Sequence, residues 1–316
     1  MTEGSLADRS RIEWPEGKPF AFTVFDDPDG QTVDAGKRIY GLLAELGFKT
    51  TRGVWPGGAV RTPNSGGASC EDEAYRRHTQ ELQALGFEVG YHNHTKHSST
   101  RDEIIAGLDT FRDYFGHDPE SMANHYNAEA IYWGPARLAP PLRALYMVAT
   151  VGRTNGRHFG HVPGHESFWG DVCRQRIRYC RNFVYANTNT LGACPWMPYY
   201  DPTKPLVNAW YASTEGSNGP RFVDALSEAN QDRLEAEGGA CIMYTHFGHG
   251  FVERGTFVRR FEQLMRRLSD KNGWFVPVSA LLDHLQSQRG LTRLESGQRR
   301  LLETRWLREK VFRGTS

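Results

Sequence analysis

This sequence has few cysteines, no long apolar run and almost no net charge, and each absence excludes a class of protein. Five of its 316 residues are cysteines, widely spaced and without a Cys-x-x-Cys pair, so we expect free thiols rather than a disulfide framework. No stretch approaches the roughly 18 consecutive apolar residues of a membrane span, which predicts no stable membrane insertion. The first 18 residues lack the apolar core of a secretory signal. We therefore expect a cytoplasmic protein.

The charges are balanced, with 38 Lys and Arg against 37 Asp and Glu and a formal net charge of +1. This balance gives no general attraction for nucleic acid or for an anionic membrane. No glycine-rich phosphate loop with its lysine is present, which argues against phosphoryl transfer. The expected partner is a small-molecule or glycan substrate.

Apolar strands and amphipathic helices alternate along the chain. The run 20–25 (FAFTVF) predicts a buried strand, and Ile39, Leu42 and Leu43 fall at helical spacing after it, with Asp34 placed to cap that helix. A similar phrase recurs, since ALGF at 84–87 repeats the ELGF of 45–48. Such alternation predicts an α/β fold with a mostly parallel sheet, either open or closed into a barrel.

Three parts of the chain differ from this pattern. Residues 1–18 are polar and predict a flexible lead-in, and 19–288 form the expected single catalytic domain. The middle, about 120–235, is rich in aromatic residues and weak in periodicity, which fits either packed loops or a substrate cleft with aromatic walls. The basic tail 289–316 predicts a helix that docks on the body or on another subunit, so a homo-oligomer through this helix is possible.

Two adjacent carboxylates, Asp26 and Asp27, directly follow the first apolar run. The carboxyl ends of strands are where α/β folds build their active sites. Neighbours on an extended segment point to opposite sides, so one carboxylate could bind a metal while the other accepts a proton. The alternative is a simple turn, because the sequence 26–30 (DDPDG) is favourable turn chemistry.

Histidines follow two other predicted strands. His92, His94 and His97 fall within six residues, a density typical of ligands for zinc or a similar metal, although a polar loop is the alternative. His246 ends the apolar run 240–245 and suits a general acid. His125 is a further candidate.

Together these segments resemble the polysaccharide deacetylase superfamily, also called the NodB-homology group or carbohydrate esterase family four. That family has Phe-Asp-Asp-Gly after its first strand, then a Gly-x-Glu-Ile-Gly-x-His segment with a second histidine, and a late strand that ends in histidine. The matching segments here are 25–27, 86–92 and 240–246. The resemblance covers about residues 18–125 and 238–286. It implies a deformed or partial (β/α) barrel with a long insertion at about 120–235.

The resemblance also implies roles for individual residues. Asp27, His92 and His97 would bind a divalent metal, usually zinc, with His94 as the reserve ligand. Asp26 would be the base that deprotonates a metal-bound water, and His246 would protonate the leaving group. The implied activity is metal-dependent hydrolysis of a C–N bond, most simply N-deacetylation of an acetylated amino sugar in glycan, glycolipid or nucleotide-sugar metabolism.

The sequence departs from the family pattern at three places. Pro28 and Asp29 precede the glycine of the first motif, which would add a carboxylate to the rim. His97 follows His92 by five positions, where the family has four.

At the third place, Asn124 and His125 stand where the family has an arginine that orients the base. The family's later aromatic and acidic pair is matched most nearly by Trp169 and Asp171. We take these four residues as candidate substrate-binding residues.

Two alternatives follow from these departures. The same fold could hydrolyse another amide, such as a cyclic imide or ureide. The protein could also be a non-catalytic carbohydrate-binding protein, although a binding module has no need of metal-ligand groups at strand ends.

Overall fold

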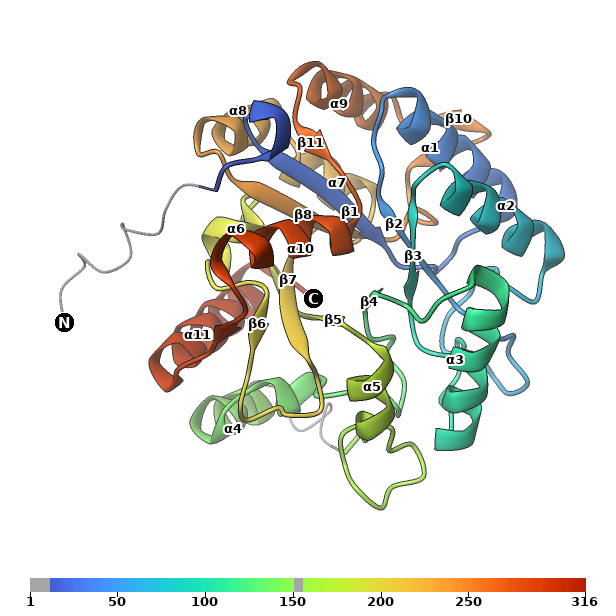
Figure 1. Cartoon of the computed structure of the whole chain (residues 1–316), viewed down its shortest axis with the longest axis vertical. Coiled ribbons are helices and arrows are strands. Elements are labelled where there is room, and N and C mark those ends of the chain that lie inside the picture. The colour runs from blue at the N-terminus through green and yellow to red at the C-terminus, as the bar shows by residue number, and fades with distance from the viewer. Residues whose placement is uncertain (1–11, 151–155) are drawn as a thin grey trace.

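Seven parallel strands form a closed barrel in this computed structural model, which describes residues 12–150 and 156–316. Each strand pairs in parallel with the next, and the last pairs with the first, as the strands at the centre of Figure 1 show. The barrel strands are β1 (Ala21–Asp26), β2 (Thr51–Val54), β3 (Glu88–Tyr91), β4 (Ser121–Met122), β5 (Tyr179–Tyr185), β7 (Ala209–Glu215) and β8 (Ala240–Thr245). The predicted (β/α) barrel is confirmed.

Helices surround the barrel (Figure 1). Their bounds are α1 (Val33–Glu45), α2 (Glu73–Ala84), α3 (Arg101–Phe115), α4 (Pro140–Ala149), α5 (Gly170–Arg176), α6 (Thr190–Ala193), α7 (Gly219–Ala225), α8 (Glu228–Ala236), α9 (Arg259–Asp270), α10 (Val278–Arg289) and α11 (Ser296–Arg313). The cap of α1 is Thr32, whose side chain accepts a bond from the backbone of Ala35, and not the expected Asp34, which lies inside the first turn.

Shorter elements complete the described part of the chain. Strand β11 extends the sheet beside β1, β6 and β12 extend it beside β7, and β9 and β10 form a separate antiparallel pair. The bounds of these strands are β6 (Tyr199–Tyr200), β9 (Val252–Glu253), β10 (Thr256–Phe257), β11 (Trp274–Phe275) and β12 (Thr292–Arg293). The described residues also form the 3₁₀ turns η2 (Pro15–Gly17) and η3 (Gly134–Arg137).

Strand β1 is buried on both faces, and its alternate residues enter two different cores. Phe22 and Val24 pack in the core that includes residues of α1 and α9, outside the barrel. Ala21 and Phe25 belong to the larger core, which includes residues of β3, β4 and β5. Because side chains alternate along a strand, the residue after Phe25 points outward and the next one points into the barrel.

The middle of the chain is not a simple insertion. Strands β4, β5 and β7 lie within residues 120–235, so this region supplies three of the seven barrel strands. The long connections are 123–178, which contains η3, α4 and α5 among its described residues, and 186–208, which contains α6 and β6. The expected single insertion of about 115 residues is therefore corrected to two long connections between barrel strands.

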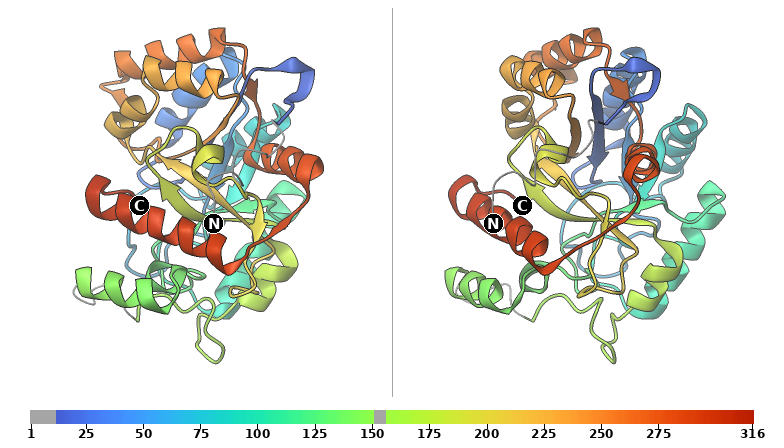
Figure 2. Two further views of the ribbon diagram at one scale, coloured as in Figure 1. Left: turned by 90° about the vertical axis from the view of Figure 1, so that its left-hand side faces the viewer. Right: turned by 60° about the vertical axis from the view of Figure 1, so that its left-hand side comes forward.

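The C-terminal tail forms the helix α11, which docks on the chain's own barrel. Leu302, Trp306 and Leu307 are buried there. Figure 2 shows α11 running beside the barrel, next to α4. These three side chains are thus used within the chain, while Leu301, Val311 and Phe312 remain exposed. Among the described helices, none is long and apolar enough to cross a membrane.

The expected flexible lead-in, 1–18, lies partly outside the described residues, which begin at residue 12. From there the chain is packed: Trp14 is buried, and its indole Nε1 donates to the carbonyl oxygen of Gly238 at 3.0 Å. A buried, hydrogen-bonded tryptophan fixes this segment against the barrel. All five cysteines are buried and free, as expected from their spacing.

Candidate active site

The loops that follow β1, β3, β4 and β8 meet at the carboxyl ends of the barrel strands. Backbone hydrogen bonds continue the sheet beyond the strand ends: Asp27 N–H donates to the carbonyl of Thr245 at 2.8 Å, and His92 N–H donates to that of Val54 at 3.0 Å. These bonds fix the backbone at the first residue of each loop. The side chains there consequently start from defined positions at the mouth of the barrel.

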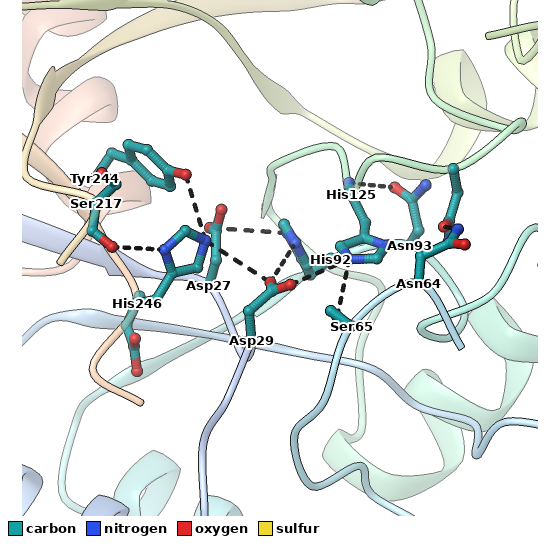
Figure 3. A network of polar contacts seen from close by, with 12 residues as sticks. Asp27, Asp29, Asn64, Ser65, His92, Asn93, His125, Ser217, Tyr244 and His246 are labelled. Carbon is teal, nitrogen blue, oxygen red and sulfur yellow. Dashed lines mark hydrogen bonds and ion pairs between the residues drawn. The ribbon is translucent and has the colours of Figure 1, made fainter. Parts of the chain in front are cut away.

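Three residues from three loops gather into a compact cluster at this mouth (Figure 3). His92 Nε2 lies 3.4 Å from Asp29 Oδ2, and His125 Nε2 lies 3.2 Å from Asp29 Oδ1. One potential ligand atom from each residue lies within 4.8 Å of the others. Two imidazoles and a carboxylate are a donor set that suits zinc and related divalent metals.

Burial and protonation fit this cluster to a cation. Burial would raise the pKa of Asp29, but hydrogen bonds from His125 and His92 lower it well below its usual range, so the carboxylate is ionised. Burial lowers the pKa of His92, which favours the neutral imidazole that binds metals. Burial also acts to lower the pKa of His125, but the bond to Asp29 raises it above its ordinary value, so a metal would have to displace a proton there. The Nδ1 atoms of His92 and His125 are buried and make no hydrogen bond with the described residues. The residues present therefore fit a metal.

Asp27 lies next to this cluster and forms an ion pair inside the barrel. Its Oδ1 accepts a bond from Arg181 Nη1 at 3.0 Å, and its Oδ2 accepts one from Arg181 Nη2. Oδ1 is also 3.7 Å from His92 Nδ1. Both carboxylate oxygens are thus engaged by one guanidinium, a bidentate arrangement that fixes the orientation of the carboxylate.

Asp26 points to the other side of the strand, away from the cluster. It is fully buried, and its Oδ1 accepts from Phe247 N–H at 2.8 Å while its Oδ2 accepts from Tyr40 Oη at 2.8 Å and from Gln31. This carboxyl ties the end of β1 to the residue after His246. Desolvation raises its pKa to about 8, although the bonds from Phe247 and Tyr40 oppose the rise.

This raised pKa predicts a pH dependence of stability. Folded Asp26 keeps its proton up to about pH 8, whereas in the unfolded chain the carboxyl has its ordinary pKa of about 3.8. The folded state therefore binds more protons between these values, and the free energy of unfolding falls as pH rises, by up to about 1.4 kcal/mol per pH unit.

The Asp26→Asn variant mimics the neutral carboxyl and should lack this slope. Urea unfolding of the wild type and the variant at pH 5, 6, 7 and 8 measures how the free energy of unfolding of each changes with pH. Parallel curves for the wild type and the variant would show that Asp26 is ionised throughout this range.

His246 completes the group on the side opposite His125 (Figure 3). Its Nδ1 lies 2.7 Å from the carbonyl oxygen of Ser217, so Nδ1 carries the hydrogen and Nε2 is left facing the site. Nε2 lies 3.8 Å from Asp29 Oδ2 and 3.3 Å from the hydroxyl of Tyr244. The histidine side chain is 17% exposed, which leaves it open to a bound molecule.

A cavity of about 120 Å³ opens onto these groups. Trp133, Tyr126 and Tyr244 give it aromatic walls, and Ser316 at the end of the described chain also lines it. The lining residues are Asp27, Asp29, His92, Asn124, His125, Tyr126, Trp133, Arg181, Val184, Tyr244, His246 and Ser316. The aromatic part of the middle region thus contributes to a cleft as well as to packed loops.

Two of the residues expected to bind substrate lie elsewhere. Trp169 is fully buried and donates to the carbonyl of Glu129 at 2.7 Å, and Asp171 pairs with Arg101 at 2.6 Å. Neither lines the cavity. Asn124 does line it, although both ends of its amide bond the backbone of Ile131.

The second expected metal ligand, His97, lies outside the compact cluster. Its Nδ1 lies 2.9 Å from the carbonyl of Ser98 and 3.5 Å from Arg61. The reserve ligand His94 packs against Gly57 and Gly107, where a Cβ on either glycine would collide with its ring. Of the three histidines in this loop, the structure brings only His92 to Asp29.

Sequence reasoning missed the arginine of this site. The family resemblance places an arginine near residue 124, on the loop after β4, where this chain has Asn124 and His125, whereas Arg181 comes from β5, the next strand of the barrel. The available signal was a single charged residue within the otherwise mostly apolar segment 179–185 (YCRNFVY), which is fully buried. A buried arginine needs a carboxylate partner, and Asp27 supplies it.

Comparison with known proteins supports the fold. No family model and no curated protein matches the sequence. A protein from Mycobacterium smegmatis assigned as a polysaccharide deacetylase has a similar structure, with a TM-score of 0.51 and 12% sequence identity, over 91% of this chain and 97% of that one. Puue allantoinase is also similar, with a TM-score of 0.53 and 12% identity, over 90% and 96% of the two chains. The likeness to polysaccharide deacetylases is thus confirmed at the level of the fold.

Proposed function

We propose that this chain, which has the barrel fold shared by a polysaccharide deacetylase and an allantoinase, is a metal-dependent hydrolase of non-peptide C–N bonds. The observation that carries the proposal is the cluster of Asp29, His92 and His125 beside an arginine-held carboxylate and an accessible histidine. Potential metal ligands, a potential base and a potential acid thus face one cavity.

The metal ligands in this proposal are Asp29, His92 and His125, which replace the sequence-based set of Asp27, His92 and His97. The insertion of Pro28 and Asp29 adds the Asp29 carboxylate two residues after Asp27 on the same loop, while the carboxylate of Asp27 is paired with Arg181. A divalent ion bound here, which we propose is zinc, would act as a Lewis acid on the substrate carbonyl. The chain's own groups supply the proton transfers.

Asp27 is the proposed general base, in place of Asp26. Its carboxylate faces the cavity and is held by Arg181, so it can accept the proton of an attacking water at Oδ1, the oxygen nearer to His92. Asp26 cannot take this role from its position, because its oxygens are bonded by Phe247, Tyr40 and Gln31 on the outer side of the strand. It acts instead by holding the backbone beside His246.

His246 is the proposed general acid. The Ser217 carbonyl holds the proton on Nδ1, so a second proton taken up at Nε2 is directed into the cavity. From there it can be delivered to the leaving nitrogen as the C–N bond breaks. The distance of 3.8 Å from Nε2 to Asp29 Oδ2, a proposed metal ligand, supports this role.

The proposed substrate is an acetylated amino sugar from glycan, glycolipid or nucleotide-sugar metabolism, and the reaction releases acetate. Aromatic walls such as those of Trp133 and Tyr126 are suited to the flat face of a sugar ring. The similarity to an allantoinase structure favours a second candidate, the opening of a cyclic ureide. We place both reactions in the cytoplasm.

The test is a substrate screen with zinc, cobalt or nickel supplied. Acetate release is followed with N-acetylated amino sugars and their phosphates, and ring opening with hydantoins and allantoin. Turnover of one class, lost in Asp27→Asn, would establish the function and choose between the two candidates. Metal binding without turnover of either class would favour a carbohydrate-binding protein.

Replacing His246 by Gln should lower turnover by about 10²–10⁴-fold on amides, because Gln cannot deliver a proton. The loss should be much smaller on an activated aryl acetate, whose leaving group departs without protonation. Steady-state kinetics on both substrates measure the difference. Equal losses on the two would show that His246 does not act on the leaving group.

A further inference from the structure

A second cavity, of about 280 Å³, lies beside α4 and is larger than the one at the proposed catalytic site. Its lining contains three cationic side chains and no carboxylate. The residues are Tyr132, Ala136, Leu138, Ala139, Pro140, Arg143, His161, Thr203, Lys204 and Arg299. In a chain with a net charge of only +1, this lining is a local excess of positive charge.

The guanidinium groups of Arg143 and Arg299 are each held through Nε, which leaves their Nη atoms available to a ligand. Arg143 Nε donates to the carbonyls of Pro135 and Leu138 at 3.1 and 3.2 Å, and Arg299 Nε donates to Asp201 at 3.1 Å. Within the described part of the chain, the Nη atoms of Arg143 and Arg299 have no hydrogen-bond partner. A guanidinium fixed in this way presents donors to an oxyanion at little entropic cost.

The neighbouring groups add donors and leave a positive balance. His161 Nδ1 accepts from Tyr132 N–H at 3.2 Å, so the neutral ring carries its hydrogen on Nε2. Asp201 neutralises one charge, since it pairs with Lys204 at 2.7 Å as well as with Arg299. Glu303 lies 4.0 Å from the same Lys204 amine. Three cations against these two carboxylates still leave one uncompensated charge beside the cavity.

A third cavity, of about 240 Å³, shares lining residues with both this pocket and the catalytic one. It shares Arg143 and His161 with the cationic cavity and Trp133 with the catalytic cavity. Its lining also contains Arg157 and His158 and no carboxylate. The cationic cavity is therefore related to the catalytic one through shared lining residues, which is the observation that relates its ligand to the substrate.

We infer that the cavity at Arg143, Lys204 and Arg299 binds a phosphate group of the substrate. Resting on the proposed function, this inference narrows the substrate to a phosphorylated amide, such as an amino-sugar phosphate or a nucleotide-linked sugar. Paired guanidinium groups and an imidazole N–H match the several oxygens of a phosphate. Neutral polysaccharide has oxygens that accept hydrogen bonds but no anionic group to balance this positive charge.

Titration of the full chain with inorganic phosphate and pyrophosphate, by calorimetry at low salt, tests the site without any need for turnover. We expect saturable binding that weakens as KCl is added. Arg143→Gln and Arg299→Gln should each weaken it about tenfold or more, as expected when a charge-assisted hydrogen bond is lost. Arg174→Gln, an equal change of charge at an exposed position, should not.

Two further variants separate this site from the catalytic one. Binding should persist in Asp29→Ala, which removes a proposed metal ligand, and in Asp27→Asn, which removes the proposed base. Phosphate binding that disappears with Asp29 would place the anion on a metal and overturn the inference. So would the absence of binding in the wild type, or equal binding of succinate, which would show no preference for phosphate.

The outcome does not depend on the proposed reaction. A folded chain that binds phosphate through Arg143 but hydrolyses no amide would keep the anion site and reject the proposed function. Circular dichroism and thermal unfolding of each variant without phosphate establish that it is folded.

Discussion

The Asp27→Asn variant should bind metal as the wild type does and lose about 10²–10⁴-fold in turnover, the contribution typical of a general base. Asn keeps the size of the side chain but cannot accept the proton of the attacking water. It also loses the bidentate ion pair with Arg181, whose side chain is only 2% exposed. Steady-state kinetics and elemental analysis of the same preparation measure both effects.

The loss of the ion pair must be separated from the loss of the base. Breaking a buried pair by removing one partner costs about 3–5 kcal/mol of stability, so turnover is measured below the melting temperature of the variant. Asp26→Asn is the matched control, since it makes the same change one residue earlier. It should retain far more activity than Asp27→Asn. The opposite ranking would restore Asp26 as the base.

Removing any one of Asp29, His92 or His125 should abolish stoichiometric metal binding and, with it, turnover. Each substitution by Ala takes one of three protein ligands from the cluster, and two ligands hold a divalent metal much more weakly than three. We expect about one transition-metal ion per chain in the wild type and well below that in each variant. Elemental analysis after supply of zinc, cobalt or nickel is the measurement.

His97→Ala is the control for this set, because His97 was the ligand expected from the sequence. The His97→Ala variant should keep its metal, since in the wild type the Nδ1 atom of His97 lies beside Ser98 and Arg61, away from the cluster. Metal lost with His97 but kept without His125 would reject the set from the structure in favour of the set from the sequence. Wild-type protein that binds no metal under any of these conditions would reject both.

The order of the chemical groups along the chain could be predicted from the sequence. Apolar runs that end in Asp, His and His, separated by amphipathic helices, predict a mostly parallel sheet with those residues at one edge, and the family resemblance adds that the sheet closes into a barrel. The parallel sheet is confirmed, and His92 and His246 lie at its carboxyl edge. These features are local, since they depend on the spacing of apolar residues and on the polar residue that ends each run.

Other features depend on contacts between distant segments. The second histidine was sought within the loop 92–97, because local spacing allowed it, but His125 comes from the next strand, β4. Arg181 reaches Asp27 across the barrel from a position 154 residues later. Nothing in a single sequence records such pairings, and they arise only when the sheet closes.

From its apolar pattern the sequence predicts β1, β2, β3 and β8 and the polar residues that end β1, β3 and β8, but not the barrel strands β4, β5 and β7 of the middle region. Which of the two adjacent carboxylates faces the site depends on how the barrel closes. β1 is apolar on both faces, so its pattern cannot show which face is inside. Closure of the barrel turns Phe25 and Asp27 inward and leaves Asp26 with Tyr40 on the helical side, because side chains alternate along a strand.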